Sequence, residues 1–310
     1  MDFKQLRAFL TVADTGNVTR AAELLNLVQP AVSRQVRLLE EDIGVELFER
    51  ERHGMVLTEA GRSLVGYARR VMLELERARA EIGGATHGVG GLVTLGLLPS
   101  ICDLLAGPLV SAVERTYPGI RSRIAMGYAS TLAQWLETGE VDAALLYGVE
   151  GSRLIQVKAL VEEDLWVVGP PSAKLRKDRP VALASLAGKP LILPNRPHGI
   201  RTLVDHACAV SGIELTISTE TNALSVQRSL ALGGHGLTIL PPIAVAADIA
   251  NKLASAAPLI EPTITRTIVL ALPANRAVGR HVRKTVDLLV DCIRDTCKRG
   301  AWPEARWLGE

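Results

Sequence analysis

Four polar side chains recur at helical spacing near the N-terminus, and their chemistry suits the recognition of nucleic acid. They are Gln29, Ser33, Arg34 and Arg37. Residues three or four apart lie on one side of a helix, so the spacing predicts a single polar face. An amide, a hydroxyl and two guanidinium groups can hydrogen-bond base edges and phosphate oxygens. An ordinary surface helix shows the same spacing, so the surrounding elements must decide between the two interpretations.

The flanking sequence predicts a helix-turn-helix. Residues 19–25 form a short helix and residues 29–41 a second one, with only residues 26–28 between them. So short a turn makes the two helices cross. Pro30 fits the first turn of the second helix, where its missing N–H has no partner to lose. The buried side of this helix is predicted to carry Ala31, Val32, Val36 and Leu39.

Further elements on both sides complete a winged helix-turn-helix. Residues 3–14 predict an amphipathic first helix, which Gly16 ends, and Asn17 suits the cap of the helix that carries Thr19. Residues 45–50 partly alternate apolar and polar, and the apolar residues 55–57 follow a short break, which predicts a hairpin. In this fold the second helix of the pair enters the major groove of DNA. We expect the hairpin to reach the DNA backbone or minor groove through Arg52. The DNA contacts predicted for this unit as a whole are Asn17, Thr19, Gln29, Pro30, Ser33, Arg34, Arg37, Arg50, Arg52 and His53.

The charge of the chain does not by itself favour DNA. The whole chain carries a formal net charge of +2. Residues 1–58 hold seven basic and nine acidic side chains, 7 − 9 = −2. Binding to phosphate therefore requires that charge is segregated by face, with Glu40, Glu41 and Asp42 directed away from the duplex.

A long linker helix is predicted from residue 59 to about residue 82. Its apolar residues alternate in steps of four and three, which is the pattern of a two-stranded coil. They are Leu64, Ala68, Val71, Leu75, Ala78 and Ile82. We expect this seam to form a homodimer, although a helix packed on its own domain would show part of the same pattern. The glycine-rich residues 83–91 predict a hinge.

Strand–helix alternation begins at about residue 91 and predicts an α/β effector domain of two subdomains, similar to periplasmic binding proteins. We divide the chain into residues 1–58 (winged helix-turn-helix), 59–90 (linker and hinge) and 91–310 (effector domain). Subdomain I covers about 91–161 and 265–300, and subdomain II about 162–264. The fold class is therefore α+β multidomain. Strands are predicted at 92–98, 121–126, 141–146, 165–168, 191–193, 215–219, 237–240 and 264–272, and helices at 99–116, 131–138, 200–211, 223–233 and 278–297.

Doubly wound domains bind ligands where strands end and helices begin, because free backbone N–H groups collect there. That rule selects residues that follow predicted strands. Each hydroxyl among them could instead do no more than cap its own helix, and an arginine there could lie on the helix surface. Several converging on one cleft would favour a small anion, in particular a carboxylate. The candidates are Ser100, Ser130, Thr131, His198, Arg201 and Asn222.

The sequence gives little indication of a disulfide, a metal site or a catalytic site. Cys102, Cys208, Cys292 and Cys297 form no CxxC pair, and the six histidines show no paired metal spacing. We expect reduced thiols, no metal, no cofactor and no catalytic residues. The N-terminus has no basic region followed by an apolar run, and two long uncharged stretches are broken by glycine and proline. We therefore expect a cytoplasmic protein without membrane spans.

The sequence resembles the LysR-type transcriptional regulators. The resemblance covers about the first 60 residues closely, and the later strand–helix order agrees with the family's effector domain. It rests on FKQLRAF at 3–9, TRAA at 19–22, QPAVSRQ at 29–35, LLE at 38–40, GVELFER at 44–50 and LTEAG at 57–61. The chain departs at Val28, where the family has Ser or Thr as the cap of the recognition helix.

The resemblance implies a homodimer or homotetramer that binds an interrupted dyad in double-stranded promoter DNA and responds to a small co-inducer, with RNA polymerase as a further partner. Ligand positions of the family correspond to Ser100, Thr131 and the loop around His198. The alternatives are an enzyme on the same fold, a solute-binding transport protein and a redox-sensing regulator. A redox sensor would need a cysteine pair in the second subdomain, where only Cys208 lies.

Overall fold

The structure is a computed structural model of the whole chain, and it describes residues 1–51, 54–84, 89–149 and 151–309. The chain divides into two compact units, one built from the N-terminal 86 residues and one from nearly all the rest. Each unit has its own hydrophobic core.

The N-terminal unit begins with three helices, α1 (Phe3–Thr15), α2 (Val18–Leu25) and α3 (Gln29–Ile43). Local sequence explains their ends. Gly16 adopts the left-handed conformation that terminates α1, and the side chain of Asn17 accepts hydrogen bonds from the backbone of Thr19 and Arg20 to cap α2. The prediction that Val28 leaves α3 without a side-chain cap is confirmed.

A two-stranded hairpin of β1 (Phe48–Glu51) and β2 (Gly54–Leu57) follows the helices. The base of β2 lies against the turn after α1, because the N–H of Met55 donates to the carbonyl of Gly16 at 2.8 Å. A Cβ on Gly54 would lie 2.3 Å from that carbonyl oxygen, so only glycine allows this approach. Arg52 and His53, predicted at the hairpin tip, lie outside the described residues.

Helix α4 (Glu59–Gly84) follows, and the apolar residues of its predicted seam are partly buried and partly exposed. Ala68 is buried in the core of the N-terminal unit and Leu64 packs against that core. The next seam residue, Val71, is 41% exposed, and the neighbouring Tyr67 is 63% exposed. The first turns of the seam therefore stabilise their own domain. The side chain of Ile82 lies outside the described residues.

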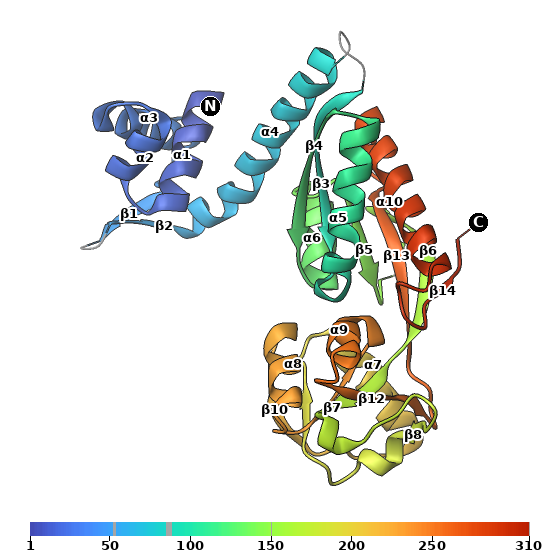
Figure 1. Cartoon of the computed structure of the whole chain (residues 1–310). Coiled ribbons are helices and arrows are strands. Elements are labelled where there is room, and N and C mark those ends of the chain that lie inside the picture. Colours follow the sequence, from blue (N-terminus) through green and yellow to red (C-terminus); the bar gives the residue numbers. More distant parts are fainter. Residues whose placement is uncertain (52–53, 85–88, 150, 310) are drawn as a thin grey trace. The chain divides into compact units, whose positions relative to one another are not determined.

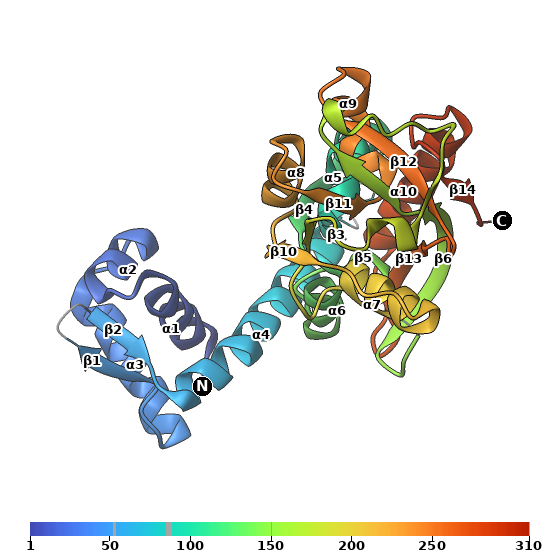
Figure 2. The same cartoon turned by 90° about the horizontal axis from the view of Figure 1, so that it is seen from below.

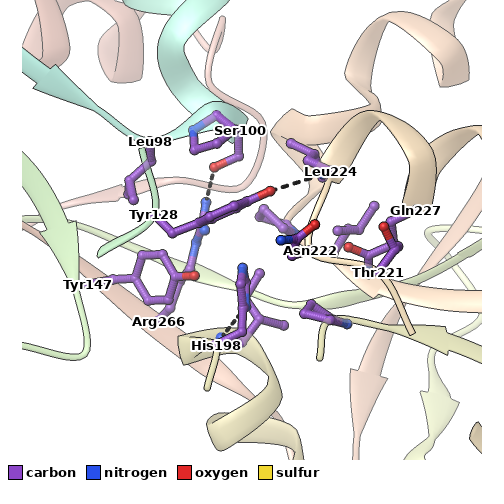
Figure 3. A pocket seen from close by; sticks show the side chains of 15 residues that line it. Leu98, Ser100, Tyr128, Tyr147, His198, Thr221, Asn222, Leu224, Gln227 and Arg266 are labelled. Atoms are coloured by element: carbon purple, nitrogen blue, oxygen red, sulfur yellow. Dashed lines mark hydrogen bonds between the residues drawn. The ribbon is translucent and has the colours of Figure 1, made fainter. Parts of the chain in front are cut away.

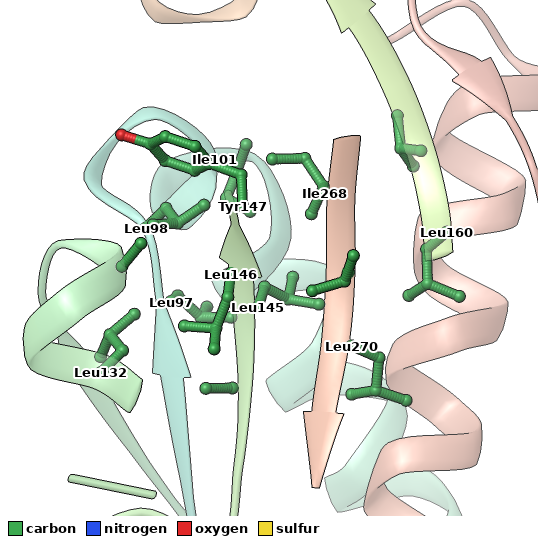
Figure 4. Close-up of a cluster of buried hydrophobic side chains, with 14 of the residues drawn as sticks. Leu97, Leu98, Ile101, Leu132, Leu145, Leu146, Tyr147, Leu160, Ile268 and Leu270 are labelled. Carbon is green, nitrogen blue, oxygen red and sulfur yellow. The ribbon is translucent and has the colours of Figure 1, made fainter. Parts of the chain in front are cut away.

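The second unit contains two six-stranded sheets (Figures 1 and 2). The first has the order β4-β3-β5-β13-β6-β14. Its parallel strands β3 (Gly90–Leu97), β4 (Gly119–Met126) and β5 (Ala143–Tyr147) alternate with α5 (Pro99–Thr116) and α6 (Ala129–Thr138). Helix α10 (Arg280–Lys298) packs beside α5. Aliphatic residues of these strands fill the core that Figure 4 shows.

The second sheet has the order β10-β9-β11-β7-β12-β8. Its strands are β7 (Trp166–Gly169), β8 (Val181–Ala182), β9 (Leu191–Leu193), β10 (Ile217–Glu220), β11 (Leu237–Leu240) and β12 (Ser255–Ile260). Helices α7 (Gly199–Ser211), α8 (Leu224–Leu232) and α9 (Ala246–Ala250) connect them, with short 3-10 turns at Pro171–Ala173, Leu183–Leu186 and Pro242–Val245.

Two strands carry the chain between the sheets. Strand β6 (Ile155–Asp164) leads from the first sheet to β7, and β13 (Thr265–Pro273) returns from β12. They pair antiparallel along their length and run side by side in both views (Figures 1 and 2). Neither β6 nor β12 was predicted as a strand, and the same holds for the two-residue β14 (Arg306–Trp307), which pairs with β6.

Candidate nucleic-acid interface and effector pocket

The polar face of α3 and the first strand of the hairpin line one groove of the N-terminal unit. The groove gathers six of the residues predicted to contact DNA: Gln29, Pro30, Ser33, Arg34, Arg37 and Arg50. Within it, the amide nitrogen of Gln29 donates to the hydroxyl of Ser33 at 3.2 Å. Arg37 lies 3.3 Å from Glu41 in an exposed pair, which contributes little to stability and leaves the guanidinium accessible. Arg34 is exposed.

The acidic residues at the end of α3 are engaged with the protein itself. Oε1 of Glu40 accepts the backbone N–H groups of Leu47 at 2.8 Å and Phe48 at 3.3 Å. This carboxylate fastens the hairpin to the recognition helix, although Glu40 still lines the groove. A carboxylate oxygen of Asp42 lies 2.6 Å from the amino group of Met1. Glu40 therefore does not point away from the predicted interface as expected, whereas Asp42 is paired with the N-terminal amino group.

Asn17 and Thr19 lie at the start of α2 and do not line the groove just described, although Val18 between them does. The side-chain oxygen of Asn17 accepts from the N–H of Thr19 at 2.8 Å and of Arg20 at 3.1 Å. Asn17 and Arg20 also line a smaller depression beside the hairpin. Arg20 was not among the predicted contacts, although it lies in the first turn of α2 after the Asn17 cap.

A pocket in the second unit lies between its two lobes, where the first turns of α5, α7 and α8 contribute lining residues (Figure 3). It contains Ser100, His198 and Asn222 of the predicted effector residues. The remaining lining is mostly apolar or aromatic, and its free volume is about 20 Å³, enough for one or two water molecules. The other lining residues are Leu98, Pro99, Tyr128, Tyr147, Pro194, Ile200, Thr221, Leu224, Gln227, Leu240, Pro241 and Arg266.

Three predicted effector residues do not line this pocket. Ser130 is exposed and Thr131 half-buried in the first turn of α6. Arg201 is buried, and its guanidinium donates to Asp205 at 2.8 Å, to Glu220 at 2.5 Å and to the carbonyl of Pro194 at 3.0 Å. Protein acceptors therefore engage this guanidinium, and it braces α7 against β10.

Arg266, which the sequence analysis missed, is the cation of the pocket (Figure 3). It lies opposite Glu163 where β13 and β6 pair, and both side chains are almost completely buried. Arg266 donates to Oε1 of Glu163 at 2.6 and 2.9 Å and to the hydroxyl of Ser100 at 2.9 Å. The indole N–H of Trp302 donates to the other oxygen of Glu163 at 3.0 Å. A single arginine in an otherwise uncharged strand was the signal for this site.

Two aromatic side chains lie beside Arg266 in the pocket (Figure 3). The ring of Tyr147 lies 5.0 Å below the guanidinium. The hydroxyl of Tyr128 accepts the N–H of Leu224 at 3.2 Å, and its ring meets the His198 ring edge-on at 4.9 Å. Tyr128 belongs to the connection between β4 and α6, whereas Leu224 and His198 belong to the second subdomain. It therefore bridges the two lobes.

Burial favours the uncharged forms of His198 and Tyr147 in the pocket. Burial, with a smaller contribution from the positive charge of Arg266, lowers the pKa of His198 from 6.5 to about 4. Burial raises the pKa of Tyr147 above its ordinary value, against the opposing charge of Arg266. Both groups are uncharged at neutral pH, and Arg266 is balanced by Glu163. His198 also accepts the N–H of Ile200 at 3.2 Å, so it caps α7.

Other sites are not apparent in the described part of the chain. No cluster of three His, Cys, Asp or Glu residues there could hold a metal ion, and the four cysteines are unpaired. None of the described helices is long and apolar enough to cross a membrane.

Comparison with known proteins defines the class of the chain. Residues 3–62 match the model described as "Bacterial regulatory helix-turn-helix protein, lysR family", and residues 86–294 match the LysR substrate binding domain. The chain belongs to the LysR family and is a DNA-binding transcriptional regulator with an effector-binding domain. Its relatives of named function, such as a transcriptional regulator and a nitrogen assimilation regulatory protein, are regulators rather than enzymes.

Particular relatives span almost the whole chain. The regulator BbuR of Bordetella bronchiseptica is 30% identical over 98% of this chain and 93% of its own. The nitrogen assimilation regulatory protein nac of Escherichia coli is 26% identical over 94% and 95%. Among solved structures, full-length OxyR from Pseudomonas aeruginosa is 26% identical over 95% of both chains, with a TM-score of 0.65. CbnR in complex with its target DNA is 24% identical over 96% of this chain and 100% of its own, with a TM-score of 0.74, and shows the fold.

Proposed function

We propose that this regulator responds to a small anionic effector, such as a carboxylate, bound beside Arg266. The buried guanidinium is the observation that carries the proposal, because Arg266 lines the pocket and is held in place by Glu163 and Ser100. Arginine presents N–H groups in a planar fork that matches a carboxylate. The first turns of α5 and α7 also reach the pocket at Ser100 and Ile200, where the helix dipoles favour negative charge.

The remaining lining sets the size and polarity of the effector. Glu163 balances Arg266, so a singly charged ligand is favoured over a multiply charged one. Leu98, Ile200 and Leu240 offer apolar surface for a hydrocarbon body. Because the free volume is about 20 Å³, such a ligand must displace lining side chains or separate the two lobes. The Tyr128 bridge is the contact that separation would break.

A ligand screen tests this proposal. We expect some carboxylates to raise the melting temperature of the full-length protein while their uncharged amides do not. A ligand at one hundred times its Kd stabilises the folded protein against unfolding by about 2.7 kcal/mol. Asn222→Ala, at an exposed lining position, should weaken that shift without changing the fold. Absence of stabilisation by any carboxylate, sulfate-like ion or amino acid, or equal stabilisation by acid and amide, would refute an anionic effector.

On the DNA side, we propose that a homodimer formed through the outer part of α4 places two copies of α3 on one duplex, and that dimers pair into a tetramer. Half-sites for paired helix-turn-helix units lie about 10 base pairs apart or a multiple of that. Gln29, Ser33 and Arg34 would read base edges, while Arg37 and Arg50 would contact phosphates. We also propose that the chain divides into residues 1–58, 59–90 and 91–310. The same proposal includes a cytoplasmic location and a contact with RNA polymerase.

Arg34→Ala tests the reading role of α3. An arginine that contacts guanine bidentately contributes about 1–3 kcal/mol of discrimination. We expect specific binding to the DNA upstream of the protein's own gene to be lost in gel-shift assays, while dimerisation stays intact. Unchanged affinity for that DNA in the variant would contradict the assignment.

A further inference from the structure

Val28 is an exposed apolar side chain at the N-terminal end of the recognition helix. It is 69% exposed, and the preceding Leu27 is 50% exposed. Its side chain makes no capping hydrogen bond. The next residue, Gln29, already lines the groove of the predicted DNA interface. Val28 therefore lies directly beside the surface that this family uses to bind DNA.

The backbone of Val28 begins the helix without help from its side chain. Its carbonyl accepts the N–H of Ala31 at 2.9 Å and of Val32 at 3.4 Å. Pro30 in the first turn needs no partner for a missing N–H. The isopropyl group is therefore not required inside the fold, and it faces solvent. A serine or threonine there would stabilise the helix better, because its hydroxyl would accept a free N–H.

We propose that Val28 is a specificity-determining residue that packs against the C5-methyl group of a thymine next to the base pair read by Gln29. N-terminal residues of a recognition helix contact base edges in the major groove. The thymine methyl is the apolar group that the major groove presents, and aliphatic side chains recognise it by contact. The exposed methyls of Val28 continue the polar interface of Gln29, Ser33 and Arg34 with an apolar contact.

Selection of binding sites from random duplex DNA gives the first test. The full-length protein, Val28→Ala and Val28→Ser are selected in parallel. Both variants lose the isopropyl group, but only serine restores a cap, so effects of helix stability separate from effects of the contact. We expect the wild-type consensus to contain a thymine beside the position read by Gln29. That preference should be lost in Val28→Ser and weakened in Val28→Ala, while both variants keep the rest of the site.

Replacing that thymine by uracil gives the second test, because uracil lacks only the methyl group. Burial of one methyl changes affinity by roughly three- to fivefold. We expect the wild type to lose about that factor per half-site and Val28→Ser to bind thymine and uracil sites equally. Val28→Ala keeps only the Cβ methyl, so its uracil effect should be smaller than that of the wild type. Uracil at a thymine elsewhere in the site is the control. Equal binding of both sites by the wild type, or an undiminished uracil effect in Val28→Ala, would overturn the proposal.

Discussion

At the residue scale, the buried Arg266–Glu163 pair decides the electrostatics of the effector pocket. Removing one partner of a buried ion pair leaves an uncompensated charge, which typically destabilises a protein by about 3–5 kcal/mol. We expect Glu163→Gln to lower the free energy of unfolding by an amount of that order. All four tryptophans lie between residues 135 and 307, so their fluorescence in urea follows the effector domain alone.

The neighbouring Glu162→Gln is the matched control. Glu162 forms a partly exposed pair with Arg306, and pairs of that kind contribute about 1 kcal/mol or less. Equal losses of stability in Glu162→Gln and Glu163→Gln would contradict the importance of the buried pair.

His198 predicts a pH dependence on the same scale. Its folded pKa of about 4 lies below the ordinary 6.5, so the unfolded chain binds more protons between these values. Stability therefore falls as pH decreases from about 6.5 to about 4. His198→Asn keeps an acceptor that can cap α7 and removes the titration. We expect the two unfolding free energies to differ by a constant above pH 6.5 and the wild type to lose stability relative to the variant below it. Parallel curves throughout would show that His198 does not titrate as expected.

At the scale of elements, the cap of α2 links stability to DNA binding. Asn17→Ala removes the acceptor for Thr19 and Arg20, which costs about 1 kcal/mol of helix stability. We expect faster hydrogen exchange of these amides in the full-length protein. Asn17→Asp keeps the cap and adds a negative charge, so it should preserve protection but weaken DNA binding if a phosphate lies there. Unchanged exchange in Asn17→Ala would remove the capping role.

Local chemistry made most elements predictable. Helix ends followed from Gly16, Asn17 and the Pro30 turn, because caps and turns depend on neighbouring residues. Strands β6 and β12 were not predicted, because they depend on pairing with distant strands rather than on neighbouring residues. Strand β6 carries the polar run Glu162–Asp164 at the crossing, and β12 contains Pro258. Their pairing partners lie far away in sequence, and tertiary contacts override such weak local patterns.

At the scale of the whole molecule, α4 predicts the assembly. Val71 lies on the heptad seam beyond Ala68 and is exposed in the single chain, so a partner helix would bury it. Val71→Glu should convert the proposed dimer to a monomer in sedimentation and lower its affinity for the full dyad. Ser63→Glu, exposed on the same helix but outside the seam, should leave the assembly unchanged. A Val71→Glu protein that remains dimeric would exclude this seam as the interface.

The sequence by itself determined the helix-turn-helix, the linker helix and the two-part α/β effector domain, because each follows from periodicity, caps and motifs within short stretches. Only the tertiary structure showed which polar residues share the effector pocket. Arg201 met every local criterion but is engaged by Glu220 and Asp205, whereas Arg266 was hidden in a strand until pairing with β6 placed it beside Glu163 and Ser100. Whether a buried charge faces a ligand depends on partners distant in the chain, and sequence spacing does not reveal those partners.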